Sequence, residues 1–106
     1  MWGGLAMGIS PLPRKVEWTE RDGKTKFKGK VVDEVYVDEE FDWGDYRKMV
    51  QLIETENGEK VIRFAYYIKN HGAPEKEFAF GSQNTLVLKQ ENARKLFEEA
   101  RRKGFF

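Results

Sequence analysis

The chain has 106 residues, of which 40% are hydrophobic and 14% aromatic, so it can bury one modest core and is not a disordered chain. Cysteine is absent, which excludes disulfide bonds, a thiolate nucleophile and a zinc site built on cysteine. Charged residues make up 35% of the chain and nearly balance at a net charge of +1, a Lys- and Glu-rich composition typical of thermophilic proteins.

The charge is unevenly distributed along the sequence. Residues 1–44 contain seven Lys or Arg against nine Asp or Glu, and residues 45–106 contain twelve against nine. The second half therefore carries the basic excess that a nucleic-acid-binding surface would need.

Residues 1–13 are expected to form a tail or a strap that pins Trp2 against the domain, because the closing Pro-Leu-Pro disfavours both helix and strand. This segment lacks the basic start and long apolar run of a signal peptide. No segment reaches the roughly twenty apolar residues of a membrane helix. We therefore expect a cytoplasmic protein without a membrane partner, whose residues 14–106 form one α+β domain.

The first hairpin is predicted over residues 14–30, where two alternating runs flank Asp22-Gly23. Asp-Gly favours a two-residue type I′ turn, and that turn would place Trp18 opposite Phe27. One face of this hairpin is then apolar and needs a packing partner.

An acidic segment, VVDEVYVDEEFDW, follows over residues 31–43. Val35 and Val37 flank Tyr36, which predicts a short edge strand. The neighbouring acids would discourage association between sheet edges.

The clearest hairpin signal is Asn57-Gly58 between YRKMVQLIE and EKVIRFAYYIK. A type I′ turn would pair Ile53 with Ile62. One face would then carry Arg47, Met49, Gln51, Ile53, Ile62, Phe64, Tyr66 and Ile68, and this more apolar face should receive the helix. The opposite face would carry Lys48, Val50, Leu52, Arg63, Ala65, Tyr67 and Lys69. A slip of one residue would exchange the faces of one strand relative to the other.

The C-terminal region is predicted to contain a strand over residues 77–88, bent at Gly81-Ser82, and then a helix over residues 90–103. The helix shows one apolar stripe, an acid in its first turn and bases in its last turn, and Gly104 follows it. The stripe, which packs on the sheet or pairs with a second copy, consists of Ala93, Leu96, Phe97 and Ala100.

These elements predict an α+β fold, in which an antiparallel, twisted β-meander of four to six strands carries one C-terminal amphipathic helix packed on one face. A single helix followed by Phe105-Phe106 would leave some apolar surface uncovered. A two-fold homodimer would cover that surface.

Enzyme chemistry is not expected. His71 is the single histidine and lies in a polar loop, whereas a catalytic or metal-bound histidine needs positioned partners. The acids of residues 33–42 lack the spacing and the glycine of a calcium loop, and Gly3-Gly4 does not open a phosphate-binding loop. We expect no metal, no cofactor and no small-molecule substrate.

The predicted sheet face away from the helix combines lysine and arginine with an aromatic residue. Single-stranded nucleic acid is bound by this combination, since cations follow the phosphates while bases stack on aromatic rings. Phe78 and Phe80 could extend this platform or the core. The predicted nucleic-acid-binding residues are Arg47, Lys48, Lys60, Arg63, Tyr67, Lys69, Lys76, Phe78 and Phe80. Core packing alone would also account for the aromatics, and the face could instead pack on the first hairpin.

Residues 41–103 read F-x-W-G, a strand, N-G-E-K-V-I-R-F-A-Y-Y, a loop with glycine and proline, G-S-Q-N-T-L-V-L and the helix. This order resembles the single-stranded-DNA-binding domain of the PC4-type transcriptional coactivators, and more loosely the archaeal ThermoDBP proteins. The resemblance implies a dimer that presents curved sheets to single strands. The DNA contacts that it implies here are Arg47, Lys48, Arg63, Tyr67 and Lys69.

The chain departs from that pattern in three places. Phe78 and Phe80 stand where more basic residues are expected, the helix lacks an Asn/Ser-Pro start, and the hairpin of residues 14–30 has no counterpart. The expected function is sequence-tolerant, non-catalytic binding of single-stranded DNA or RNA, with DNA preferred. The alternative is a protein-interaction module, or a small homo-oligomeric structural domain, without a role in nucleic-acid binding.

Overall fold

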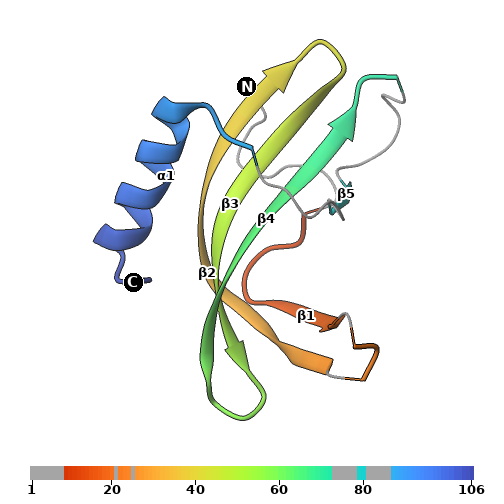
Figure 1. Cartoon of the computed structure of the whole chain (residues 1–106), viewed down its shortest axis with the longest axis vertical. Coiled ribbons are helices and arrows are strands. Elements are labelled where there is room, and N and C mark those ends of the chain that lie inside the picture. Colours follow the sequence, from red (N-terminus) through yellow and green to blue (C-terminus); the bar gives the residue numbers. More distant parts are fainter. Residues whose placement is uncertain (1–8, 21, 25, 73–78, 81–86) are drawn as a thin grey trace.

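The computed structural model describes residues 9–20, 22–24, 26–72, 79–80 and 87–106. The elements in chain order are β1 (Arg14–Thr19), β2 (Lys26–Phe41), β3 (Gly44–Thr55), β4 (Lys60–Asn70), β5 (Ala79–Phe80) and α1 (Gln90–Arg102). Each strand pairs antiparallel with the next, so the sheet order is β1-β2-β3-β4-β5. The predicted α+β meander with one C-terminal helix is therefore confirmed (Figure 1).

The sheet is strongly curled, with α1 on one side and β1 and β5 on the other (Figure 1). The curl follows from β2, which pairs with β1 through its first half and with β3 along most of its length. Its pairing register shifts between Val31 and Asp33, where a bulge increases the local twist. Gly29 lies just before this point, and a Cβ atom there would be 2.4 Å from the carbonyl oxygen of Glu54.

The strand around Tyr36 is longer than predicted, because β2 has 16 residues. The described part of β1 pairs only with residues 26–31 of β2, so the segment around Tyr36 pairs with β3 alone and lies at the edge of the sheet, as predicted. Four of the six acids in residues 33–42 form ion pairs with basic residues from other parts of the described chain. These ion pairs are Arg14–Glu34, Arg47–Asp38, Lys48–Glu39 and Lys103–Asp33.

The β1–β2 hairpin has the predicted register, with Trp18 opposite Phe27. Its turn differs from the expected type I′, because Gly23 has a positive φ and Asp22 does not. The turn is closed by the Gly23 N–H, which donates to the Glu20 carbonyl oxygen at 3.0 Å.

The sequence prediction misplaced the register between β3 and β4 by one residue. Asn57 has no positive φ, whereas Gly58 has φ +87°, so the turn is not type I′. The Gly58 N–H donates to the Thr55 oxygen at 2.9 Å and the Thr55 N–H to the Glu59 oxygen at 2.8 Å. This is the three-residue hairpin loop in which a type I turn is followed by a left-handed glycine. It pairs Ile53 with Val61 in place of Ile62.

Because of this one-residue error, the prediction placed the side chains of β4 on the correct faces of the sheet and those of β3 on the opposite faces. The core under α1 contains Val50 and Leu52 of β3 beside Ile62 of β4, together with Leu96 and Ala100 of α1. A second, smaller core on the opposite face consists of Met49, Ala65, Tyr67 and Ile9. Ile9 packs against this second core. Trp2 lies outside the described residues, so the tail or strap of residues 1–13 stays a prediction.

The helix spans Gln90–Arg102, within one residue of the prediction. Leu96 and Ala100 are buried, Ala93 is half-buried, and Phe97 is 39% exposed, so the stripe is only partly used in packing on the sheet. Among the described residues, no helix is long and apolar enough to cross a bilayer.

The strand expected over residues 77–88 is present at Ala79–Phe80, where it pairs with Tyr67 and Ile68 of β4. Val87 and Leu88 are not in a strand. The expected bend at residues 81–82 lies outside the described residues, as do Lys76 and Phe78.

Candidate nucleic-acid interface

Lys48 does not lie on an exposed basic rim, because the one-residue slip turns it toward α1. Its side chain is buried, and Nζ donates to Glu39 Oε1 at 2.7 Å and to the Val87 carbonyl oxygen at 2.6 Å. The second oxygen of Glu39 accepts the Lys89 N–H at 3.1 Å and the Asn92 side-chain amide at 2.8 Å. The Lys48–Glu39 pair therefore fixes the start of α1 on the sheet.

The electrostatics of Glu39 agree with this structural role. Burial alone would raise the pKa of Glu39, but the hydrogen bonds from Asn92, Lys48 and Lys89 outweigh it and hold the pKa below its ordinary value. The carboxylate is thus ionised and paired with Lys48 inside the protein. Lys48 is therefore not available to a ligand at the surface.

Arg47 lies on the face away from α1 but is buried in a bidentate ion pair. Its Nε and Nη2 donate to the two oxygens of Asp38 at 2.9 and 3.0 Å, and its Cζ lies 3.9 Å from the centroid of the Tyr36 ring. Burial by itself would lower the pKa of Arg47, but the hydrogen bonds with Asp38 and its negative charge outweigh this effect, so the pKa lies above its ordinary value. This arginine holds β2 and β3 together.

On the sheet face away from α1, a half-buried combination of cation and aromatic rings is centred on Arg63 of β4. Its Cζ lies 4.7 Å from the centroid of the Phe80 ring and 5.3 Å from that of Trp18. Trp18 in turn stacks on Phe27 with centroids 5.0 Å apart, and Phe80 meets Tyr67 edge to face at 5.5 Å. The curl of the sheet causes this meeting, because β1 and β4 are not neighbours in the strand order.

The Arg63 guanidinium is oriented by a chain of polar side chains, one from each of the first four strands. Nε of Arg63 donates to Gln51 Oε1 at 2.8 Å, and Gln51 Nε2 donates to Glu34 Oε1 at 3.2 Å. Arg14 donates to both oxygens of Glu34 at 3.2 and 2.9 Å. Burial lowers the pKa of Arg63 from its ordinary value, although an arginine stays charged at neutral pH.

The remaining predicted site residues are distributed as follows. Tyr67 is buried between Arg47 and Phe80, and Lys69 is half-buried on the same face, opposite Asp45. Lys60, the first residue of β4, is exposed on the other face. The structure thus brings together Arg63, Tyr67 and Phe80 from the prediction, but it engages Arg47 and Lys48 in ion pairs and separates Lys60.

Sequence reasoning missed Trp18 and Phe27 beside Arg63, and it missed Arg14 and Gln51, which belong to the polar chain that orients Arg63. A signal for the first two was present, since the predicted hairpin register already gave Trp18 and Phe27 a common apolar face in need of a partner. The contact of Arg14 with Glu34 depends on the curl, which no local pattern indicates. We call Trp18, Phe27, Arg63, Tyr67 and Phe80 the aromatic–arginine cluster.

His71 directly follows β4 and contacts the turn between β2 and β3. Nδ1 lies 3.0 Å from the Asp42 carbonyl oxygen and Nε2 lies 2.9 Å from Asp45 Oδ1. The hydrogen bond with the Asp42 backbone, and then the one with Asp45, raise the pKa of His71. Within the part of the chain that the structure describes, no group of three potential metal ligands comes together.

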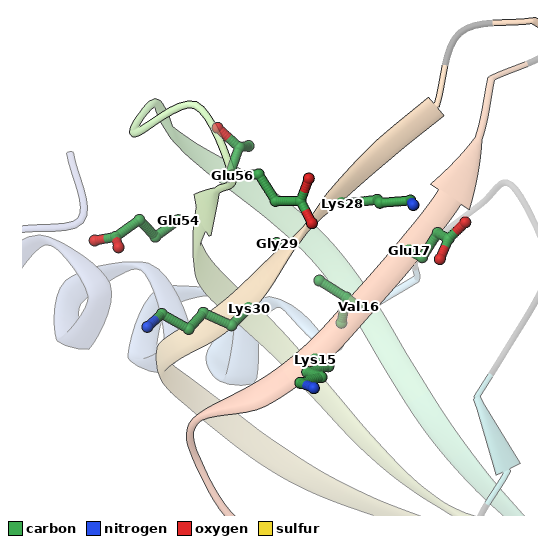
Figure 2. Close-up of a pocket in the computed structure, with 9 residues that line it drawn as sticks. Lys15, Val16, Glu17, Lys28, Gly29, Lys30, Glu54 and Glu56 are labelled. Carbon is green, nitrogen blue, oxygen red and sulfur yellow. The ribbon is translucent and has the colours of Figure 1, made fainter.

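A groove at the bend of β2 is a weaker candidate for a binding site. Figure 2 shows that Lys15, Lys28 and Lys30 share its lining with Glu17, Glu54 and Glu56. The charges balance, so the groove has no preference for an anion or a cation.

A second exposed aromatic surface lies on the side of α1. Phe64 of β4, Phe97 of α1 and Phe106 are 51%, 39% and 59% exposed. The Phe97 ring contacts those of Phe64 and Phe106, with centroids 5.9 and 6.4 Å apart. We call these three residues the phenylalanine surface.

Comparison with protein-family models, with curated proteins and with solved structures finds no match to this chain. The resemblance to the PC4-type domain therefore stays an expectation.

Proposed function

We propose that the chain binds single-stranded nucleic acid, without performing chemistry, on the sheet face opposite α1. The observation that carries this proposal is the aromatic–arginine cluster, in which a guanidinium group lies between two aromatic side chains of a concave sheet face. Unstacked bases pack on such rings, and the cation contributes to binding beside them.

The exposure of the cluster supports the proposal. Phe80 is 46% exposed, and Trp18, Phe27 and Arg63 are half-buried, so their contacts within the protein leave surface for a ligand. Lys69 adds a cation on the same face, and it has no ion pair with a described residue. A duplex would keep its bases stacked on one another, so a platform of rings favours single strands.

The test is fluorescence anisotropy with labelled single-stranded DNA, single-stranded RNA and duplex DNA over a range of salt concentrations. We expect single strands to bind more tightly than duplex, with log K falling by about 0.7 for each neutralised phosphate per unit of log salt. Phe80→Ala should weaken binding by about 1–3 kcal/mol if one base stacks on this ring.

Lys95→Gln is the matched control, because Lys95 is exposed on α1 and pairs with Glu91 alone among the described residues. This variant should bind as the wild type does. Absence of binding to every single strand at low salt would exclude the proposed function.

A second candidate, docking of a protein partner, is favoured by the phenylalanine surface. A second copy of this chain is the partner that we consider, since α1 carries both charge signs next to Phe97. Arg94, Glu98 and Arg101 make no ion pair with any described residue, and in an antiparallel helix pair Glu98 of one copy could meet an arginine of the other. Both candidates can hold together, because the two surfaces lie on opposite faces of the sheet.

A further inference from the structure

The terminal nitrogens of Arg63 are available to a ligand. Nε is engaged by Gln51 at 2.8 Å, but neither Nη nitrogen donates to any residue that the structure describes. No buried side-chain nitrogen or oxygen among these residues lacks a partner, so the two Nη groups reach solvent. The guanidinium thus presents two parallel donors at the surface.

These donors are held in one orientation. Gln51 is fully buried, and its amide nitrogen donates to Glu34. Arg14 in turn donates to both carboxylate oxygens of Glu34. A fixed fork loses little conformational entropy when it binds, and it recognises a ligand by its geometry as well as by its charge.

The rings beside Arg63 select for a planar ligand. A base that packs against Phe80 or Trp18 would place its edge close to the guanidinium, which lies 4.7 and 5.3 Å from the two ring centroids. Guanine presents two neighbouring acceptors, O6 and N7, on one edge, and these match two parallel donors. On the corresponding edge adenine and cytosine present an amino donor, and thymine offers a single acceptor beside a methyl group. Cytosine has two neighbouring acceptors, O2 and N3, on its Watson–Crick edge, which is open in a single strand, so the comparison of dG with dC is the decisive one.

We infer that Arg63 determines specificity at one position of the bound strand and recognises guanine through its two Nη groups, with Trp18 and Phe80 flanking the base. This inference rests on the proposed function, and it adds a preference at one nucleotide to otherwise sequence-tolerant binding. A phosphate could also accept both donors, but it gains nothing from the flanking rings.

The test compares short oligothymidylate strands whose central nucleotide is dT, dG, dA or dC, measured by anisotropy with the full chain. We expect the dG strand to bind about 5- to 150-fold more tightly than the others, as a bidentate contact with one base does. Replacing the central guanine by 7-deazaguanine removes N7 and should abolish most of this preference. This comparison needs no protein variant and so does not depend on the folding of one.

Arg63→Lys keeps the charge but removes the fork, so it should reduce the preference for dG to less than about twofold while binding to oligothymidylate persists. Arg101→Lys, at an exposed position on α1, is the matched control and should keep the full preference. Equal affinity for all four strands would overturn this inference and leave the proposed function intact. Absence of binding to any strand would overturn both.

Discussion

At the scale of single residues, the buried pair of Lys48 and Glu39 predicts a large effect from a small change. Lys48→Met keeps the volume of the side chain but leaves the Glu39 carboxylate buried without its cation. Removing one partner of such a pair costs about 3–5 kcal/mol, and we expect a loss of this size in the free energy of unfolding, measured with urea.

The surface pair of Lys95 and Glu91 provides the control. Lys95→Met breaks an exposed ion pair of 3.5 Å and should cost less than about 1 kcal/mol. The double variant Lys48→Met/Glu39→Gln should lose less than the sum of the two single variants, because neither partner then leaves a buried charge behind. Strict additivity would contradict the assigned coupling.

The same pair gives a pH dependence with a defined sign. The pKa of Glu39 lies below its ordinary value of 4.5, so its stabilising effect is fully present above that pH and is lost as the pH falls through the lowered pKa. In Glu39→Gln this loss is absent, and the unfolding free energy of the variant should therefore decline less in acid than that of the wild type.

At the scale of elements, the sequence predicted those structures that depend on local pattern. The helix was predicted to within one residue, because its apolar stripe and its terminal charges all lie within the 13 residues of Gln90–Arg102. The hairpins were predicted as elements, but the register of β3 with β4 was not. Asn57-Gly58 is compatible with two turn types, and the choice between them shifts every later pair by one residue.

The candidate site was predicted in part for the same reason. Arg63 and Tyr67 were placed on the correct face because β4 was assigned correctly, whereas Lys48 was placed on the wrong face together with β3. The contribution of Trp18 depends on the curl of the sheet, which brings β1 to β4 across two intervening strands. Such a contact between distant strands leaves no mark in a local window of sequence.

Gly29 provides the test of the curl at this scale. In Gly29→Ala, the new Cβ would lie 2.4 Å from the Glu54 oxygen and 2.9 Å from the Thr55 Cα, both of them backbone atoms that cannot move independently. We expect β2 and β3 to separate at this point, with a loss of about 1–3 kcal/mol in unfolding free energy. Gly72→Ala is the control, because among the described residues its Cβ would approach a side chain, that of Asn70 at 3.2 Å, and no backbone atom. Equal stability of the two variants would show that the close approach at Gly29 does not constrain the sheet.

At the scale of the whole molecule, the two faces of the sheet are covered to different extents. On the face of α1, the helix buries Leu96 and Ala100 but leaves the phenylalanine surface in solvent. Three contacting phenylalanines form a contiguous apolar patch, and burial of one such side chain contributes about 1.5–3 kcal/mol. The second candidate function therefore predicts a dimer whose population rises with protein concentration.

Phe97→Ser combined with Phe106→Ser should shift this equilibrium to the monomer, raising the dissociation constant by at least about tenfold for each phenylalanine removed, as sedimentation equilibrium would measure. The fold should tolerate the change, since both side chains are substantially exposed in the single chain. Val87→Ser removes an apolar side chain that is even more exposed, before the start of α1, and should leave the association unchanged. A wild-type chain that stays monomeric at all concentrations would exclude a second copy as the partner of this surface. Single-strand binding by the double-serine variant should then equal that of the wild type, because the aromatic–arginine cluster lies on the other face of the sheet.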